Sequence, residues 1–326
     1  MRGRFFCKSH YFSHARGYVR AIIKYIRMCK KLRNYHILTD SCSDLTTELR
    51  NKYDIDYVQM NIVYNGKELP ADLDWKTYTP KEMYDVMRGG TRITTTQVPA
   101  ETFNKKFTEY AEKGVDVLYI GCSSALSGSI NTGHVVANEV MEAHPEMKII
   151  CIDSLNSCMG EGLLAIKAAK LKAEGKTLEE TAEYLEKNKL KYNQFCVAET
   201  LEYLKRAGRV KASKAFFGNL FGVKPIIISD ARGANFAIKK AKGRKGSILE
   251  TVAMCKEAIV NPEEQTLYIV HADCEEDVKL FKEELLKEIP CKDVYVSYIG
   301  PIIGASVGPG ALAVYCVGKE VTVIGD

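Results

Sequence analysis

Several sequence patterns are missing from this chain, and each absence excludes a class of protein. The 326 residues contain no run of 18 apolar residues, so no segment is predicted to span a membrane. The cysteines form no Cys-x-x-Cys pair and no Cys/His cluster with zinc spacing. The phosphate-binding patterns Gly-x-x-x-x-Gly-Lys-Ser/Thr and Gly-x-Gly-x-x-Gly are absent as well. We therefore expect no metal and no cofactor.

Acidic residues are absent from residues 1–33, which carry ten Lys or Arg. The rest of the chain holds 36 of the 46 basic residues against all 41 acidic ones, a formal charge of −5 in a chain of net charge +5. Nucleic-acid-binding proteins carry basic residues across their folded surface, so the acidic body argues against that class. The length and the 46% hydrophobic content are enough for two domains with real cores.

Residues 1–33 form a basic N-terminal extension. Its apolar residues from Val19 to Ile26 follow helical spacing, with Lys and Arg around them. Such a helix can lie on an anionic membrane surface or act as a targeting segment. Alternatively, the extension is upstream sequence read from the wrong start, because Met28 stands just before the first predicted strand.

The eleven cysteines are odd in number and scattered along the chain. This distribution predicts reduced thiols, most of them small core residues, and not a disulfide framework. Reduced thiols favour a cytoplasmic location.

A hydroxyl-rich loop follows the apolar strand predicted at residues 115–120 and precedes a helix that starts near residue 129. Ligands bind at the carboxyl ends of strands in open α/β sheets, where helix N-termini offer unpaired N–H groups. Either the serines only cap the helix, or they form a site for an anion or a carboxylate. The four serines in question are Ser123, Ser124, Ser127 and Ser129.

The apolar patterns predict alternating strands and helices along the whole body. In the first half we expect strands at 36–39, 58–64, 92–96, 115–120 and 147–152. Helices are expected from Ser43 as N-cap to Arg50, and at 80–87, 103–110 and 160–173, with a hairpin turn at Asn65-Gly66. The first and last of these strands both end in Asp-Ser, which predicts polar groups along one rim of the sheet.

The second half repeats the alternation. Strands are expected at 194–198, 224–228, 236–238, 266–270, 294–299 and 311–316, and helices at 177–187, 201–207, 247–260 and 277–287. The pattern predicts two α/β domains, residues 34–175 and 176–326, the first with a Rossmann-like, mostly parallel sheet. A cleft between two such halves is the expected place for a ligand.

The order of these segments resembles the DegV family of bacterial fatty-acid-binding proteins, which includes the acyl-carrying subunits of fatty acid kinases. The resemblance covers residues 36–326 and rests on five motifs in family order. These are Thr39-Asp40-Ser41, Thr95-Thr96-Gln97, Ser123-Ser124-Ala125-Leu126-Ser127-Gly128, Tyr203-Leu204-Lys205-Arg206-Ala207-Gly208-Arg209-Val210 and Gly308-Pro309-Gly310.

The resemblance implies one long-chain fatty acid, such as palmitate, with its tail inside the protein and its carboxylate held by two loops. By position these loops supply Thr96, with Thr95 beside it, and Ser127, with Ser124 nearby. It also implies a role in lipid metabolism, with a fatty acid kinase as the partner that makes an acyl phosphate. Arg209 is expected to serve that partner, because Arg suits recognition of phosphate or carboxylate.

One position departs from the family pattern. Many members have a His near the C-terminus that reaches the ligand head group, whereas this chain has Ser306 there. A Ser hydroxyl can still donate to a carboxylate, but it cannot carry a charge.

The alternative function is an acyl-transfer or hydrolytic enzyme that uses a loop serine. The segment Gly121-Cys122-Ser123-Ser124-Ala125 lacks the second Gly of a nucleophile elbow. Neither His271 nor His134 is tied to Ser127 by a sequence signal. A signalling or interaction module is the remaining alternative, and a lipid-binding carrier without catalytic residues is the interpretation we favour.

Overall fold

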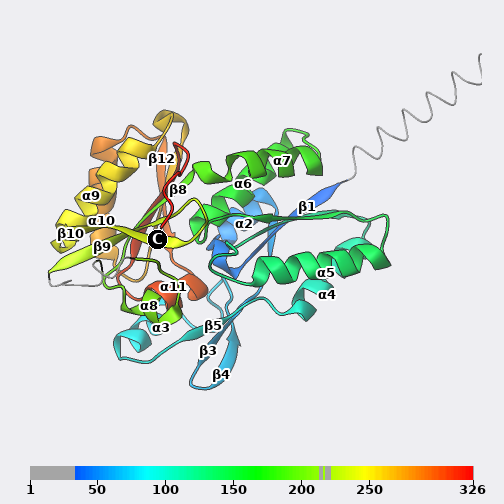
Figure 1. The fold of residues 1–326 in the computed structure, drawn as a ribbon, viewed down its shortest axis with the longest axis horizontal. Coiled ribbons are helices and arrows are strands. Elements are labelled where there is room, and N and C mark those ends of the chain that lie inside the picture. The colour runs from blue at the N-terminus through cyan, green and yellow to red at the C-terminus, as the bar shows by residue number, and fades with distance from the viewer. Residues whose placement is uncertain (1–33, 213–215, 217–221, 326) are drawn as a thin grey trace, which may run out of the picture.

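The computed structural model describes residues 34–212, 216 and 222–325. The predicted helix in residues 1–33 lies outside the described residues. Within them, the chain forms two main sheets and a small third one, with helices around them (Figure 1). No helix among the described residues is long and apolar enough to cross a membrane.

The first sheet is all parallel, with the strand order β2-β1-β6-β7. Helices α4 and α5 cover one face, and α2, α6 and α7 cover the other (Figure 1). The chain reverses its direction of winding between β1 and β6, so ligands are expected at the carboxyl ends of these two strands. The bounds are β1 Tyr35–Asp40, β2 Ile55–Val58, β6 Asp116–Gly121, β7 Ile149–Asp153, α2 Thr47–Tyr53, α4 Ala100–Glu112, α5 Ser129–Ala143, α6 Met159–Ala173 and α7 Leu178–Asn188.

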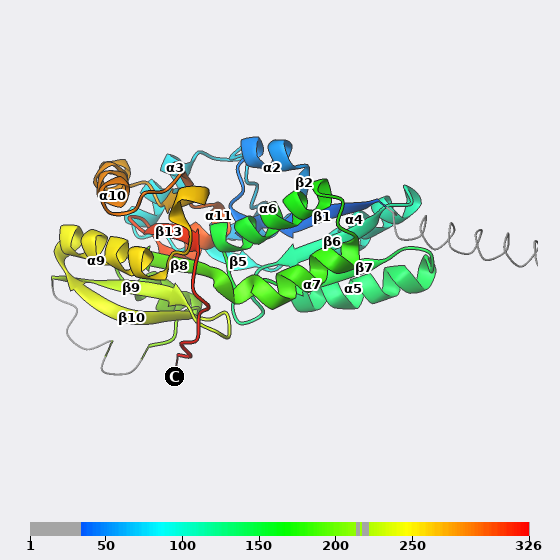
Figure 2. The same cartoon turned by 90° about the horizontal axis from the view of Figure 1, so that it is seen from above.

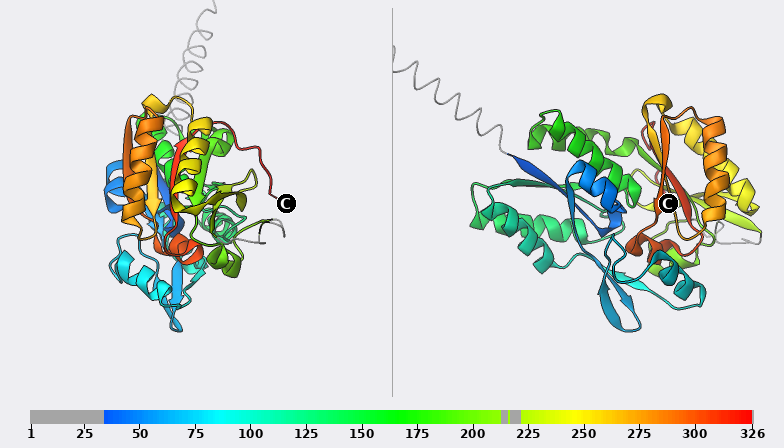
Figure 3. Two further views of the ribbon diagram at one scale, coloured as in Figure 1. Left: turned by 90° about the vertical axis from the view of Figure 1, so that its left-hand side faces the viewer. Right: turned by 180° about the vertical axis from the view of Figure 1, so that it is seen from behind.

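A three-stranded antiparallel sheet projects from the first half (Figures 1 and 3). Asn65 and Gly66 both have positive φ, 49° and 71°, which confirms the predicted hairpin turn between β3 and β4. Strand β5 pairs with β3 and brings the Thr-rich motif next to the first sheet. The bounds are β3 Asn61–Tyr64, β4 Lys67–Pro70, α3 Pro80–Arg88 and β5 Thr94–Thr96.

The second sheet is mixed, with the order β10-β9-β8-β13-β11-β12 and one parallel pair, β11 with β12. Helices α9 and α10 cover its outer face, away from the first sheet (Figure 2). The bounds are β8 Tyr192–Val197, α8 Glu202–Ala207, β9 Val223–Ser229, β10 Asn235–Lys242, α9 Gly243–Ala258, β11 Thr266–His271, α10 Glu275–Glu288, β12 Asp293–Tyr298, α11 Pro301–Val307 and β13 Leu312–Val317, with 3-10 turns η1 Ser41–Ser43, η2 Lys189–Lys191 and η3 Pro262–Glu264.

Two predictions about individual elements are wrong, and one helix was not predicted. Residues 58–64 are not one strand, because the chain bends between β2 and β3. Ser43 does not cap α2: it lies in η1, and Thr46 is the N-cap that accepts from the Leu49 N–H at 3.3 Å. The Gly-rich stretch 300–310 contains a helix, α11, which starts at Pro301 because a Pro is well tolerated in a first helical turn.

The division of the chain remains a prediction, and we propose a later boundary than the one expected near Gly175. Helix α7 follows Gly175 but packs on β6 and β7 of the first sheet. Its capping box, Thr177 with Glu180, fixes its start as predicted. A boundary at η2 keeps α7 with the sheet that it covers.

Candidate functional site

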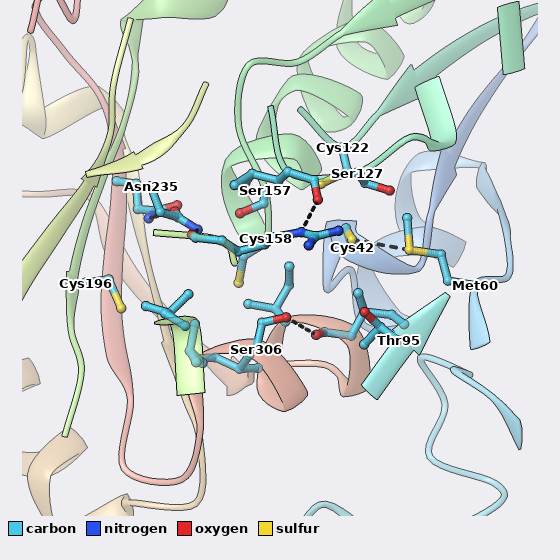
Figure 4. Close-up of a pocket in the computed structure, with 18 of the residues that line it drawn as sticks. Cys42, Met60, Thr95, Cys122, Ser127, Ser157, Cys158, Cys196, Asn235 and Ser306 are labelled. Atoms are coloured by element: carbon cyan, nitrogen blue, oxygen red, sulfur yellow. Dashed lines mark hydrogen bonds between the residues drawn. The ribbon is translucent and has the colours of Figure 1, made fainter. Parts of the chain in front are cut away.

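A cavity of about 160 Å³ lies where the carboxyl ends of β1 and β6 face the second sheet (Figure 4). Both halves of the chain line it, and the predicted ligand cleft between two α/β units stays a prediction that this cavity matches in position. Of the predicted site residues, it brings together Thr95, Thr96, Ser127, Ser306 and Arg209. Its walls further include Cys42, Met60, Gln97, Cys122, Leu126, Gly128, Ser157, Cys158, Gln194, Cys196, Leu204, Asn235, Ile299, Ile302, Ile303, Val307, Ala313 and Tyr315.

The two threonines of β5 differ in their hydrogen bonds. Successive side chains of a strand point to opposite faces, so Thr95 and Thr96 point to opposite sides of β5. The Thr96 hydroxyl donates to Glu68 Oε1 at 3.1 Å, whereas the structure gives the Thr95 hydroxyl no hydrogen-bond partner among the described residues. Thr95 lies at the cavity beside α11 (Figure 4). Of the pair, Thr95 therefore has the hydroxyl that is available to a ligand.

Ser127 lies in the loop between β6 and α5, and a chain of hydrogen bonds holds its hydroxyl. Val98 N–H donates to Ser129 Oγ at 3.1 Å, and Ser129 Oγ lies 3.0 Å from Ser127 Oγ. The backbone N–H of Ser129 also donates to Ser127 Oγ, at 3.3 Å. The α5 N-cap is Gly128, which has no side chain to cap the helix, so Ser127 satisfies the first N–H of α5 and still lies at the cavity.

Ser306 reaches the cavity from α11. Its hydroxyl donates to the Ile302 carbonyl one turn earlier, at 3.2 Å (Figure 4). Tyr84 fixes this helix, because its buried hydroxyl donates to the Ile299 carbonyl at 2.7 Å just before the helix begins. The sequence showed Ser306 within a Gly-rich stretch, and the helix is what presents it to the cavity.

Arg209 lines the cavity as well as an adjoining groove. It follows Gly208, which ends α8 in the left-handed conformation at φ 68°. Its Nε donates to the Leu126 carbonyl at 2.7 Å, in the same loop as Ser127. The predicted partner residue is therefore exposed in part but lies directly beside the hydroxyl cluster.

Ser124 is the one predicted ligand residue that the cavity does not include. It is exposed, and its N–H donates to Asp153 Oδ1 at 3.2 Å, across to the end of β7. The loop bends between Ser123 and Ser127, because Leu126 N and Ser127 N both donate to the Ser123 carbonyl. That bend turns Ser127 inward and leaves Ser124 outside.

Sulfur atoms form much of the cavity wall, which sequence analysis missed. Cys42 Sγ lies 3.5 Å from Met60 Sδ, and Cys122, Cys158 and Cys196 also face the cavity (Figure 4). Burial raises the pKa of the Cys196 thiol to about 12. Such thiols are neutral at physiological pH and act as small apolar side chains. No sequence signal distinguished them from ordinary core cysteines.

Comparison with known proteins places the chain in a family. The sequence model of the DegV family, described as uncharacterised protein, matches residues 34–319. The chain belongs to the DegV family. A DegV domain-containing protein of Clostridium perfringens is 35% identical over 287 residues, which cover 88% of this chain and 98% of that protein. One from Streptococcus pyogenes is 30% identical, covering 88% of this chain and 99% of that protein.

Solved structures share the fold. A fatty-acid-binding DegV family protein from Thermus thermophilus superposes with a TM-score of 0.77 at 26% identity, covering 88% of this chain and all of that one. DegV, a fatty acid binding protein from Bacillus subtilis, gives 0.76 at 26% identity over the same shares of both chains. The predicted family and the predicted α/β fold are therefore confirmed.

In this DegV protein, buried carboxyl groups hold the loops behind the cavity. Asp40 accepts from the N–H groups of Cys42 and Cys122 at 2.8 and 3.1 Å, and from the Tyr119 hydroxyl at 2.8 Å. Asp153 lies two strands away, with β6 between them. The two carboxylates therefore lie at the same edge of the sheet, as predicted, and Asp40 is a buried group that ties the ends of β1 and β6 together.

Asp44 joins the two halves behind the same wall. Cys158 Sγ donates to its Oδ2 at 2.7 Å, and the Gly300 N–H donates to the carboxyl from the second half. A Cβ on Gly300 would overlap Asp44 Oδ1, so this contact requires glycine. Burial raises the pKa of Asp44 to about 7.

Proposed function

We propose that this protein binds one long-chain fatty acid in the cavity and carries it, without transforming it, to a partner enzyme. The observation that carries the proposal is the meeting of three hydroxyls from separate elements at one apolar, sulfur-lined cavity: Thr95 on β5, Ser127 before α5 and Ser306 on α11. Relatives of the same fold are described as fatty-acid-binding proteins, which supports the same ligand here.

The head group is proposed to accept hydrogen bonds from Ser127 and Thr95, with Ser306 beside them. Ser129 Oγ accepts a hydrogen bond from the Val98 N–H, and its own hydroxyl can donate to Ser127 Oγ. Ser127 then accepts from Ser129 twice and has its own proton free for the carboxylate. Such a chain of donors strengthens each bond in it. Thr96 is bound to Glu68, and Ser124 is outside, so neither is part of this proposed site.

The tail supplies the binding energy. Palmitate has about 14 methylenes, which are worth roughly 11 kcal/mol gross at about 0.8 kcal/mol each. Pockets for drug-sized ligands usually hold about 300–1,000 Å³, whereas this cavity holds about 160 Å³. We therefore propose that the two halves separate slightly as the tail enters between them.

Carriage agrees better with the arrangement than the alternative acyl-transfer or hydrolytic activity. No histidine lines the cavity in the described part of the chain. His271 accepts from the Cys274 N–H at 3.4 Å, and its ring lies 4.4 Å from that of Tyr298. The serine that would serve as nucleophile contacts another serine and no general base, which leaves it without activation.

The proposed partner is a fatty acid kinase. Hydroxyls without a fixed positive charge orient a carboxylate but bind it weakly enough to be handed on. Arg209 stands at the edge of the head-group site and has a guanidinium suited to carboxylate or phosphate. We propose that it meets the partner or the phosphoryl group that the partner transfers.

Titration of the purified, delipidated protein with palmitate in a calorimeter tests the binding proposal. We expect saturation at one palmitate per chain, with a negative heat-capacity change because apolar surface is buried. Heat without saturation, or saturation with many molecules per chain, would show that palmitate does not enter a built site.

A further inference from the structure

A second hollow lies between the two halves and shares no lining residue with the fatty-acid cavity. It holds about 560 Å³, within the range of about 300–1,000 Å³ that suits a small-molecule ligand. Helices α2 and α6 form one wall, and the second sheet forms the other at the start of β8, β11 and β12. We call it the lysine–tyrosine groove, after its residues Lys52, Lys167, Lys170, Lys292, Tyr53, Tyr192, Tyr268 and Tyr295.

Four lysines from three separate elements converge on this groove without forming ion pairs. Lys172, on the same helix α6, pairs with Asp54 at 3.4 Å. In contrast, none of the four groove lysines has a carboxylate oxygen within 4 Å among the described residues. Burial and then repulsion from the other three lysines lower the pKa of Lys170. An anion placed among them would remove that repulsion.

Aromatic rings line the same groove. Lys52 and Lys170 both lie over the Tyr53 ring, at 5.4 and 5.7 Å from its centre. The rings of Tyr268 and Tyr295 lie 5.6 Å apart on the opposite wall. Tyr192 and Tyr268 are buried, so the half-buried Tyr53 and Tyr295 are the rings that offer a face on which a flat base can stack.

Three carboxylates also line the groove, and none of them forms an ion pair with the four lysines among the described residues. Glu48 accepts from the Tyr295 hydroxyl at 3.3 Å, and Asp293 from the Val294 N–H at 2.8 Å. Glu264 completes the set on the second-sheet side. Carboxylates of this kind accept from the hydroxyls of a ribose, as they do in dinucleotide sites.

We propose that the lysine–tyrosine groove binds a nucleotide, with its phosphates among Lys52, Lys167, Lys170 and Lys292 and its base against the tyrosine rings. The groove has cations for the phosphates, aromatic rings for the base and carboxylates for the ribose hydroxyls. Side chains supply these groups, and no Gly-rich loop is needed. This site is separate from the fatty-acid cavity and does not depend on the function proposed above.

Three probes test the proposal on the full chain in calorimetry: ADP, pyrophosphate and adenosine. We expect saturable ADP binding that is at least tenfold tighter than binding of either other probe, because only ADP has both charge and ring. The double variant Lys52→Gln/Lys170→Gln should lose at least tenfold in ADP affinity. Lys67→Gln, which removes an exposed charge on the β3–β4 hairpin, should change it less than twofold.

Several results would overturn the proposal. They are no saturable ADP binding, equal affinity for pyrophosphate and ADP, or unchanged ADP affinity in the double variant. Thermal unfolding and palmitate binding of each variant show whether it is folded. If the double variant is unfolded, the single variant Lys52→Gln, at an exposed residue, replaces it in the test. We expect this single variant to lose at least threefold in ADP affinity. Failure of palmitate binding in the unmodified protein would contradict the carrier function and leave this test intact.

Discussion

The cavity proposed to hold a fatty acid and the lysine–tyrosine groove lie between the same two halves of the chain but differ in the charge of their lining. The cavity lies at the carboxyl ends of parallel strands and has neutral hydroxyls, thiols and apolar side chains, with Arg209 at its edge. The groove lies where α2 and α6 meet the second sheet, and four lysines and three carboxylates line it beside four tyrosines. The position of a cleft between two domains therefore does not determine which ligand it binds. The side chains that line the cleft determine it.

Removal of the head-group hydroxyls should have the largest effect. We expect Ser127→Ala and Thr95→Ala each to weaken palmitate binding roughly tenfold or more, because a hydrogen bond to a charged group is worth about 1.5–3 kcal/mol. Thr96→Ala is the matched control and should have a smaller effect, since its hydroxyl binds Glu68. Calorimetry with palmitate measures all three. An equal loss in the two threonine variants would contradict the choice of Thr95.

The second largest effect should be a difference in salt dependence between ADP binding and palmitate binding. Raising the salt from about 0.05 to about 0.5 M screens charges, so we expect ADP binding to weaken about tenfold. Palmitate binding should change less than about twofold, because tail burial dominates it. Titrations of both ligands in the same buffers make the comparison. A strong salt dependence for palmitate would mean that a cation, with Arg209 the nearest, holds the carboxylate.

Filling the cavity should shift its preference for chain length. Cys196→Phe adds a ring to the wall of a cavity of about 160 Å³, and overfilling costs about 1–3 kcal/mol. We expect stearate to bind several-fold more weakly and laurate to be nearly unaffected. Cys291→Phe, which is half-buried outside the cavity, is the control. A uniform loss for both acids would indicate general destabilisation, and no loss would place the tail elsewhere.

The pH dependence should show the smallest effect. Burial raises the pKa of Cys196 to about 12 and that of Tyr315 above its usual value, so neither titrates between pH 6 and 8. Palmitate affinity should therefore be nearly constant in that range. In Ser306→His, the bound carboxylate favours the imidazolium, so affinity should rise as the pH falls and be lost as the pH rises through the pKa of the complex.

Binding isotherms at three pH values compare the two proteins. A steep change near pH 7 in the unmodified protein would contradict the prediction. It would point to Asp44 behind the cavity wall, whose pKa burial raises to about 7.

The sequence correctly predicted the features that depend on interactions between residues close together in the chain. The apolar run before Ser123, the Asn65-Gly66 turn and the Thr177–Glu180 capping box all appear in the structure as expected. The N-cap of α2 was predicted at Ser43 and not at Thr46, because the sequence did not show that Asp40 caps an additional turn, η1, before the helix.

Features that depend on tertiary contacts were beyond prediction. The choice between Thr95 and Thr96 depends on the register of β5 against β3, and the helix that presents Ser306 depends on Tyr84. The thiols of the cavity wall come from four distant segments. The lysine–tyrosine groove likewise unites residues that are more than 200 positions apart, as Lys52 and Lys292 are.

Organic extraction of the purified protein, followed by mass spectrometry of the extract, tests the central claim most directly. If the cavity carries a fatty acid, the extract should contain long-chain fatty acids at close to one per chain, and the Ser127→Ala/Thr95→Ala double variant should retain far less. An extract without fatty acid, from protein that also fails to bind added palmitate, would contradict the account.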